Sequence, residues 1–362
     1  MSRTRSTSGR RQPTILDVAR AARVSKSTVS NVLRDAPEVA PDTRQRVLDA
    51  IAKVGYRPNA LARNLVQRRT TTVGIVVGDL ANPFYSELAK LAEQRLAAVG
   101  LATMICNTDG LQRNEQEKIE MLLEHRVAGI LMLQFTGQSA TLEKLRETGV
   151  ALVIASQLQP GADCVDVDER AGADLAVTHL LELGHERIAY LSSDLVERQS
   201  ERSRLSGYTR ALRRAGARHD ARLVVRMRHP APLRSDDRLR DALGGLRALD
   251  DPPTAVFASN DLLAVDLLET AEEQGLVVPK DLSIVGFDDI LVAGLSRVAL
   301  TTVVQPREEL ARLAIGLLLE RIEEGAHGPA RRYLLPPELV VRGSTAPPLR
   351  REDEVAHALP AT

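Results

Sequence analysis

The sequence predicts a small all-α head joined to a larger α/β body with parallel sheets, on three observations. First, residues 1–69 hold 15 Arg and Lys against 5 Asp and Glu, whereas the rest of the 362-residue chain holds 33 against 43. Second, residues 14–33 carry two short helical periodicities separated by a tight turn. Third, after residue 70 an amphipathic stretch, a glycine and a short β-rich run recur. This recurrence indicates strands alternating with helices, and hence doubly wound lobes.

Composition narrows the classes of protein that remain. At roughly 150 residues per domain the length predicts two or three domains, and 44% hydrophobic residues exclude a disordered chain. The two cysteines, Cys106 and Cys164, argue against a disulfide framework or a cysteine-rich metal site, so we expect no metal and no cofactor. Because no apolar run approaches the ~18 residues of a membrane span and no apolar segment follows the basic N-terminus, we expect a cytoplasmic protein without a membrane partner.

Residues 14–33 are typical of a helix-turn-helix. Thr14 and Asp17 resemble a capping box that begins the first helix, and apolar residues recur at the spacing of a buried face. After the turn at 23–25, Ser25 can cap a second helix, whose outward face is polar: Lys26, Ser27, Ser30 and Asn31. A second helix with such a face suits the major groove of DNA. A generic two-helix hairpin is the alternative.

The rest of the head is a third helix and a hinge. Proline begins the predicted third helix at about Pro41, and Gly55 follows its end near Val54. The segment after Pro58 has about eight helix-competent residues, too few for a stable isolated helix. We therefore divide the chain into five parts. These are a basic disordered tail (1–12), a helix-turn-helix domain (13–57), a hinge with its linker (58–69), the body (70–342) and a second disordered tail (343–362). The last tail has no leucine heptad, so a tetramerising coiled coil is not expected.

The segments TILDVARAARVSKSTVSNVL and VAPDTRQRVLDAIAKVGYRPNALARNL resemble the N-terminal part of the LacI/GalR (lactose-repressor) family of transcription regulators, and the resemblance continues to about residue 342. It implies a nucleoid-associated repressor that forms a homodimer through its body and binds a pseudo-palindromic double-stranded operator. It further implies a periplasmic-binding-protein-like body of two subdomains, with crossovers near residues 168, 299 and 330 and a small-molecule effector between them. A protein corepressor stays open as a further partner.

The resemblance also assigns roles within the head. Three polar residues of the second helix and a leucine in the hinge would contact bases: Lys26, Ser27, Asn31 and Leu65. Lysine and asparagine can donate to base edges, and an apolar wedge can kink the duplex. Phosphate contacts, which position the protein without reading sequence, are expected from Thr14, Ser25, Thr28, Ser30, Arg34, Thr43 and Arg63. The sequence departs from the family at Arg23, where glycine is usual, and a positive φ there would cost on the order of 1 kcal/mol.

In the body, the resemblance implies effector contacts from residues near strand ends: Asn82, Phe84, Tyr85, Phe135, Arg204, Asn260, Asp288 and Gln305. Amides, an arginine fork and aromatic faces suit a ring with hydroxyl groups. The alternatives are helix capping for Asn260, Asp261 and Gln305, a turn for Asp288 and plain core packing for the aromatic residues. A sugar or sugar derivative is the first expectation for the effector and a nucleoside or purine the second, because Ser156 and Gln157 depart from the pattern of many sugar-responsive members.

Two other classes of protein are less consistent with the sequence. A solute-binding transport protein would share the body but should carry a signal peptide and no basic helix-turn-helix. An enzyme would need a nucleophile, a phosphate loop or a metal motif, and the sequence contains no GxGxxG, GxxxxGK[ST], HExxH or GxSxG pattern. We therefore expect a DNA-binding regulator that is not an enzyme.

Overall fold

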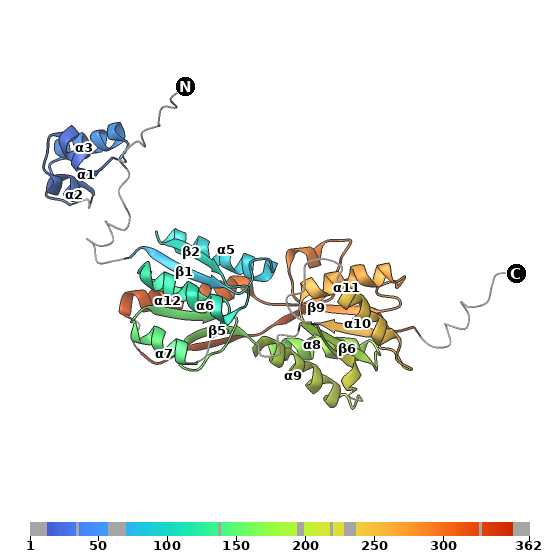
Figure 1. Ribbon diagram of the computed structural model, residues 1–362. Helices are drawn as coiled ribbons and strands as arrows, with labels where there is room; N and C mark the ends of the chain where they lie inside the picture. Colours follow the sequence, from blue (N-terminus) through green and yellow to red (C-terminus); the bar gives the residue numbers. More distant parts are fainter. Residues whose placement is uncertain are drawn as a thin grey trace, which may run out of the picture. The chain divides into compact units, whose positions relative to one another are not determined.

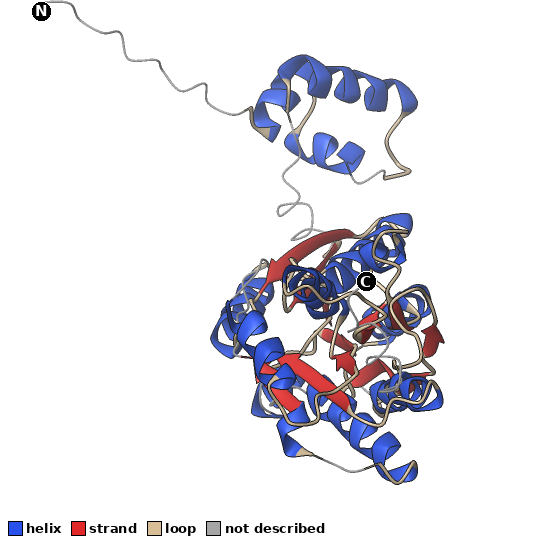
Figure 2. Cartoon of the chain, turned by 90° about the vertical axis from the view of Figure 1, so that its right-hand side faces the viewer, coloured by secondary structure: helices blue, strands red, loops and turns tan. Residues whose placement is uncertain are grey.

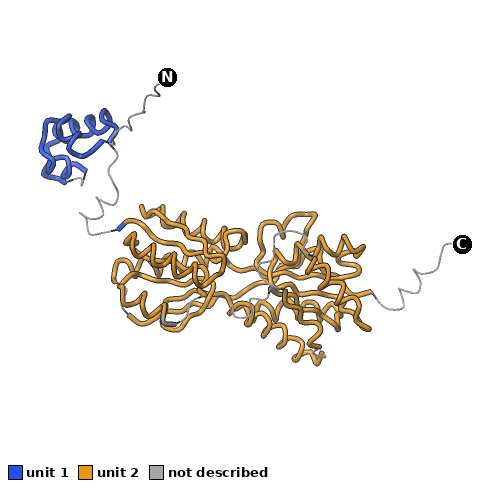
Figure 3. The backbone as a smooth tube through the Cα atoms, in the orientation of Figure 1, with its two compact units in different colours: residues 1–70 blue, residues 71–362 orange. Residues whose placement is uncertain are grey.

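The chain forms two units, residues 1–70 and 71–362 (Figure 3). The computed structural model describes residues 13–33, 36–56, 70–136, 139–193, 199–217, 220–227, 237–325 and 328–349. The expected hinge at 58–69 lies outside these residues, together with the predicted contacts Arg34, Arg63 and Leu65. Among the described residues, no helix is both long and apolar enough to cross a membrane.

The head contains three helices, α1 (Ile15–Ala22), α2 (Lys26–Leu33) and α3 (Pro41–Val54). Their small core is apolar, with Val18, Val29 and Val47 fully buried. The predicted cap of α1 is present, since the backbone nitrogen of Thr14 donates to the Asp17 carboxylate at 2.9 Å and its hydroxyl donates at 2.7 Å. The predicted helix-turn-helix and third helix are therefore confirmed.

Arg23 ends α1 in the left-handed region, with φ 56° and ψ 46°. A side chain with a Cβ is strained in this region, whereas glycine is not. Arg23→Gly should therefore stabilise the head by about 1 kcal/mol. Hydrogen exchange of peptides covering residues 14–33, measured in the full chain, should show roughly fivefold higher protection. Unchanged or lower protection would contradict this estimate, and Arg20→Gly, within the helix, is expected to act in the opposite direction.

The first lobe of the body, which contains the labels β1, β2 and β5 in Figure 1, is built on six parallel strands in the order β11-β5-β4-β3-β1-β2. These strands are β1 (Thr72–Val77), β2 (Ala102–Asn107), β3 (Gly129–Met132), β4 (Ala151–Ala155), β5 (Asp163–Val167) and β11 (Arg332–Leu335). Two layers of helix cover the sheet, α5 (Pro83–Ala98) with α12 (Arg307–Glu324) and α6 (Gln112–Glu124) with α7 (Ser139–Glu147). Because both faces are covered, the central strands are apolar along their length.

The second lobe has five parallel strands and one antiparallel edge strand, in the order β12-β10-β9-β8-β6-β7. These strands are β6 (Ile188–Ser193), β7 (Val224–Met227), β8 (Ala255–Ala258), β9 (Ser283–Asp288), β10 (Thr301–Val304) and β12 (Glu338–Val340). The α-helices are α8 (Glu169–Glu182), α9 (Gln199–Arg214), α10 (Asp237–Arg247) and α11 (Asp261–Glu273), with 3-10 turns η1 (Ala221–Leu223) and η2 (Leu291–Gly294). Figure 2 shows the strands enclosed by helices. The expected two-lobed α/β body with parallel sheets is therefore confirmed.

The chain passes between the lobes three times, and two of the passages lie later than predicted. The first follows β5 at Asp168, as expected. The second is at 305–306 rather than near 299, because β10 must first pair with β9 in the second lobe. The third is at 336–337 rather than near 330, because β11 must first pair with β5 in the first lobe. All three passages border the boundary between the lobes.

The sequence predicts a disordered tail from Gly343, but the structure places residues 343–349 against the second sheet. Ser344 is 2% exposed, and its hydroxyl donates to the Ile284 carbonyl at 2.6 Å and accepts from the Thr301 nitrogen at 2.8 Å. The Ala346 carbonyl accepts from Ser283 at 3.0 Å. The prediction is wrong for these residues, because backbone and hydroxyl pairing to β9 and β10 fixes a segment that lacks any apolar periodicity.

Candidate DNA-reading helix and interlobe pocket

The polar face of α2 is presented outward. Lys26 and Ser27 are exposed, and Ser30 and Asn31 are half-buried, while Val29 and Val32 fill the core beneath them. The helical period places the four polar residues on one side, opposite the core. α2 therefore offers a continuous face of donors and acceptors with no large apolar side chain.

Four other predicted DNA contacts lie at or near the starts of the three helices of the head. Ser25 begins α2, because its Oγ accepts from the Thr28 nitrogen at 3.0 Å and lies 2.6 Å from Ser27 Oγ and 2.8 Å from Thr28 Oγ1. Thr14 and Thr43 are half-buried at the starts of α1 and α3. Helix N-termini direct free backbone N–H groups outward, which suits phosphate oxygens. The cap predicted for Ser25 is confirmed.

In the body, the structure brings three of the predicted effector residues together. Arg204 lies 3.5 Å from the Asp288 carboxylate, and Gln305 Nε2 donates to the same Asp288 Oδ1 at 2.7 Å. All three are buried, with 7%, 3% and 2% exposure. Gln305 does not cap α12, whose cap residue is Pro306. Asp288 has φ 118°, a strained backbone of the kind that collects at functional sites.

Arg204 is also held by residues that the sequence did not single out. Its Nε and NH2 groups donate to both oxygens of Glu169, at 2.7 and 3.0 Å, and its NH1 group donates to the Ser259 carbonyl. The guanidinium lies over the Phe287 ring, 3.9 Å from its centroid. Glu169 is the first residue after the crossover at Asp168, and that position was the only sequence signal for it.

The other predicted effector residues have structural roles. Asn82 caps α5 by accepting from the Phe84 nitrogen at 3.0 Å, and Asn260 caps α11 by accepting from the Leu263 nitrogen at 2.9 Å. Phe84 and Phe135 are buried in the core, at 2% and 5% exposure. The capping alternative thus describes Asn260 and the core alternative describes the two phenylalanines, whereas the capping role of Asn82 was not predicted. Tyr85, half-buried, packs edge-on against Phe84.

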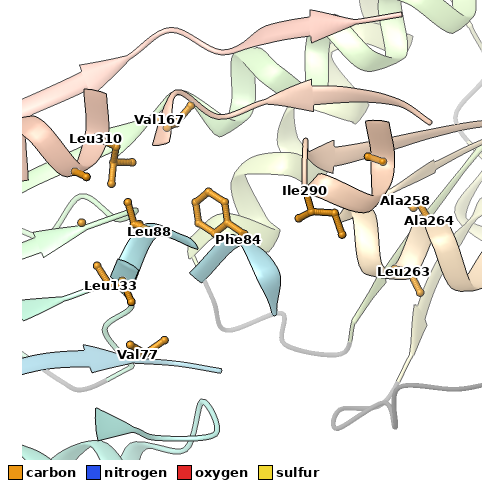
Figure 4. Packing of buried hydrophobic residues seen from close by; sticks show 14 of the residues in the cluster. Val77, Phe84, Leu88, Leu133, Val167, Ala258, Leu263, Ala264, Ile290 and Leu310 are labelled. Carbon is orange, nitrogen blue, oxygen red and sulfur yellow. The ribbon is translucent and has the colours of Figure 1, made fainter. Parts of the chain in front are cut away.

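The core continues across the boundary between the lobes. Figure 4 shows the ring of Phe84 between Leu88 of the first lobe and Ile290 of the second. These residues belong to one buried cluster that also includes Leu310 and Leu263. Phe84 therefore joins the lobes near the expected effector contacts instead of presenting a free aromatic face.

A pocket of about 370 Å³ opens at the boundary between the lobes. It is lined from the first lobe and from α8 and α9 of the second lobe by Ser156, Gln157, Leu158, Asp166, Val167, Asp168, Glu169, Arg170, Gln199, Ser200, Arg202, Ser203, Ser206 and Leu334. Ser156 has φ 65°. Two carboxyl groups near the pocket have altered acidity. Burial raises the pKa of Asp166 to about 7, and the negative charge of Glu169 adds to this effect. Burial also raises the pKa of Asp288 to about 7.

Asp261, for which helix capping was the alternative, is not the cap of α11, which is Asn260. Asp261 is the first residue of that helix and is fully buried. Its carboxyl accepts from the Ile290 nitrogen at 2.9 Å and pairs with the Thr302 hydroxyl at 2.5 Å. Burial raises the pKa of Asp261 to about 8, and the nearby Asp288 carboxylate adds to this effect. Asp261 therefore links α11 to the segments after β9 and in β10, and it does not line the pocket.

The acidity of Asp261 predicts a pH dependence. The unfolded carboxyl loses its proton near pH 4 and the folded one only near pH 8, so stability from this group falls as the pH rises between these values. Asp261→Asn, a neutral isostere, should remove a slope of up to about 1.4 kcal/mol per pH unit between roughly pH 5 and 7. Urea unfolding of both proteins across this interval measures it, and identical slopes would contradict the assignment.

The comparisons with known proteins agree with both units. Residues 14–59 match the family "Bacterial regulatory proteins, lacI family", and residues 177–345 match the "Periplasmic binding protein-like domain". The HTH-type transcriptional regulator DegA of Bacillus subtilis is 36% identical over 344 residues, which span 92% of this chain and 98% of DegA.

Two similar solved structures are of regulators in complex with a ligand or with DNA. The transcriptional regulator CelR bound to cellobiose is 31% identical with a TM-score of 0.67, covering 92% of this chain and 100% of that one. The Lac repressor dimer bound to operator and the anti-inducer ONPF is 26% identical with a TM-score of 0.76, covering 93% and 100%. The resemblance found in the sequence is thus confirmed over nearly the whole chain, which belongs to the LacI family of DNA-binding transcriptional regulators.

Proposed function

We propose that the chain is a homodimeric repressor whose affinity for a pseudo-palindromic operator changes when a small molecule binds between the lobes of the body. The observation that carries the proposal is the combination, in one chain, of an exposed polar face on α2 and a buried polar network at the lobe boundary. A transport protein would need only the second of these features.

On the DNA side, Lys26, Ser27 and Asn31 read base edges in the major groove, since lysine can donate to guanine and asparagine can bond adenine bidentately. Thr14, Ser25, Thr28, Ser30, Arg34, Thr43 and Arg63 take phosphates, and Leu65 acts as the wedge at the centre of the operator. A dimer places two copies of α2 on two half-sites related by a two-fold axis.

Dimerisation through the body is supported by exposed apolar side chains at one edge of the first lobe. Ile105 lies in the edge strand β2 and is 45% exposed, and Val99 and Leu111, near the two ends of that strand, are 56% and 53% exposed. Apolar side chains gathered on an edge are typical of surfaces that a partner covers. The Lac repressor in the similar structure is a dimer on its operator.

On the effector side, a sugar or sugar derivative is the first candidate and a nucleoside the second. The similar regulator CelR is solved with cellobiose, and the pocket here is lined mainly by hydroxyl, amide and charged groups. Arg204, Asp288 and Gln305 form the buried polar centre beside it. A ligand that contacts both lobes stabilises one arrangement of the lobes, and the coupling to DNA is typically ~1 to 3 kcal/mol, equal in both directions.

Fluorescence anisotropy of a labelled operator, titrated with the full chain in the presence of pooled sugars or pooled nucleosides, tests this proposal. We expect one pool to change the operator dissociation constant by about 5- to 150-fold. An operator affinity that no pool changes would contradict effector control, while leaving DNA binding itself to be judged from the titration without ligand.

A further inference from the structure

The wall of the interlobe pocket is rich in acceptors. Asp166 and Glu169 both line it and are 7% and 6% exposed. The Asp166 carboxylate accepts from the Val167 nitrogen at 2.8 Å and from the Leu158 nitrogen, but it forms no ion pair with any cation in the described part of the chain. A buried carboxylate without an ion-pair partner is costly, and burial raises the pKa of Asp166 to about 7. A cation bound beside Asp166 would therefore favour its ionised form.

The buried guanidinium of Arg204 is engaged by other groups. Three nitrogens of Arg204 already donate to protein acceptors, two to Glu169 and one to the Ser259 carbonyl, and the Asp288 carboxylate lies 3.5 Å from NH2. A ligand carboxylate or phosphate would have to displace the buried Glu169 from this bidentate pair. The family's effector arginine is thus occupied by the protein itself.

Two further polar atoms in this region have no partner among the described residues. Gln305 donates to Asp288 through Nε2, which leaves its Oε1 buried without a donor. Ser156 Oγ, in the wall of the pocket, is likewise buried without a partner. Gln305 is 2% exposed, so water does not reach it freely. Both atoms can accept a hydrogen bond. Ser156 Oγ, which lines the pocket, is therefore open to a donor on a ligand.

The two cations that line the pocket lie at its surface. Arg170 and Arg202 are exposed, so their charges act through solvent and are screened there. The carboxylates, in contrast, are buried, where a charge has a larger effect on a bound group. The buried part of the site therefore favours positive charge, even though the rim alone would favour an anion.

We infer that the effector carries a protonated amine beside hydroxyl groups, as an amino sugar does, with the ammonium against Asp166 and Glu169. An ammonium is a pure donor with three N–H groups. It matches a pocket in which Asp166 has no ion-pair partner among the described residues and the buried arginine is occupied. This inference rests on the proposed function, in which the interlobe pocket takes the effector, and it selects the charge of that effector.

Matched ligands test the charge directly. Isothermal titration calorimetry of the full chain near neutral pH compares D-glucosamine, D-glucose and D-glucose 6-phosphate, and the corresponding amine, alcohol and phosphate of galactose. We expect an amine to bind about tenfold or more tightly than its hydroxyl twin, because a hydrogen bond to a buried charge is among the strong ones, and the phosphate to bind weakest.

Two variants test whether the preference for an amine arises in the pocket. Asp166→Asn keeps the size of the side chain and should bring the amine to within about threefold of its hydroxyl twin, since the ion pair is lost. Glu186→Gln, an exposed carboxylate outside the pocket, should leave the amine preference intact. Circular dichroism melting of both variants shows that the fold is retained.

The inference is overturned if the phosphate or the neutral sugar binds as tightly as the amine, if no amine binds at millimolar concentration, or if Asp166→Asn keeps the full preference. Operator binding by the same preparation is scored separately. Operator binding with a preference for neutral sugar would overturn the amine inference alone, whereas an amine preference without operator binding would support the inference and overturn the proposed function.

Discussion

Replacing Arg204 with alanine is expected to destabilise the body by about 3–5 kcal/mol and to abolish the response to effector, because it leaves buried carboxylates without a counter-charge. Glu169 and Asp288 would both lose their cation, and each is less than 10% exposed. Urea unfolding of the full chain, followed by far-ultraviolet circular dichroism, measures the loss of stability. Arg213→Ala, exposed on the same helix α9, is the matched control and should change stability by less than about 0.5 kcal/mol.

A second variant separates the ion pair from simple loss of packing. Glu169→Gln in the Arg204→Ala background removes the orphaned charge, so the double variant should be less destabilised than the sum of the two single ones, by roughly 1–3 kcal/mol. Additive effects would show that the two side chains act independently, against the bidentate contact in the structure. A normal effector response in Arg204→Ala would remove this residue from the effector network.

Lys26→Ala and Asn31→Ala are expected to be the most damaging changes on the DNA side. A good base contact is worth about 1–3 kcal/mol, and a dimer loses it in both half-sites, so each variant should weaken operator binding by about 2–6 kcal/mol, or at least roughly 30-fold. Fluorescence anisotropy with specific and scrambled duplexes measures the loss. Binding to the scrambled duplex should change far less, because phosphate contacts supply it.

Two controls set the scale for this prediction. Lys53→Ala removes an exposed charge at the end of α3 and should leave the ratio of specific to scrambled binding unchanged. Thr43→Ala, at a proposed phosphate contact, should weaken binding to both duplexes alike. If Lys26→Ala and Asn31→Ala behaved like these controls, α2 would not be the reading element.

Much of the head could be predicted from local sequence, because its helices are bounded by local chemistry. The capping box at Thr14, the cap at Ser25, the proline at Pro41 and the glycine at Gly55 each satisfy or release backbone groups within a few residues. All four have the predicted roles. The unusual Arg23 could also be identified as a position of positive φ, although only the structure shows the angle.

The lining of the pocket was not predicted, because its composition depends on contacts between distant segments. None of the eight predicted effector residues is among the lining residues. Arg204, Asp288 and Gln305 lie together in the structure, but Glu169, which holds Arg204 and lines the pocket, is 35 residues away from it in sequence. No local periodicity marks such a partner. Asn82 and Asn260 show the converse problem, since an amide at a strand end also precedes a helix and there satisfies its free N–H groups.

Two of the three crossover positions and the predicted start of the tail were wrong for a similar reason. A short strand such as β10 or β11 has little sequence of its own to mark where it ends, and its length is decided by the neighbour with which it pairs. Residues 343–349 are mostly small residues and two prolines, a composition typical of a free tail, yet Ser344 pairs with two strands of the second sheet.

A selection of random duplexes with the full chain at physiological salt tests the central claim most directly, that the head reads a specific operator as a dimer. The account predicts an enriched pseudo-palindrome whose two half-sites are related by a two-fold axis, and loss of that enrichment for Lys26→Ala. Recovery of only salt-sensitive binding without an enriched sequence, or of an asymmetric single site, would contradict it.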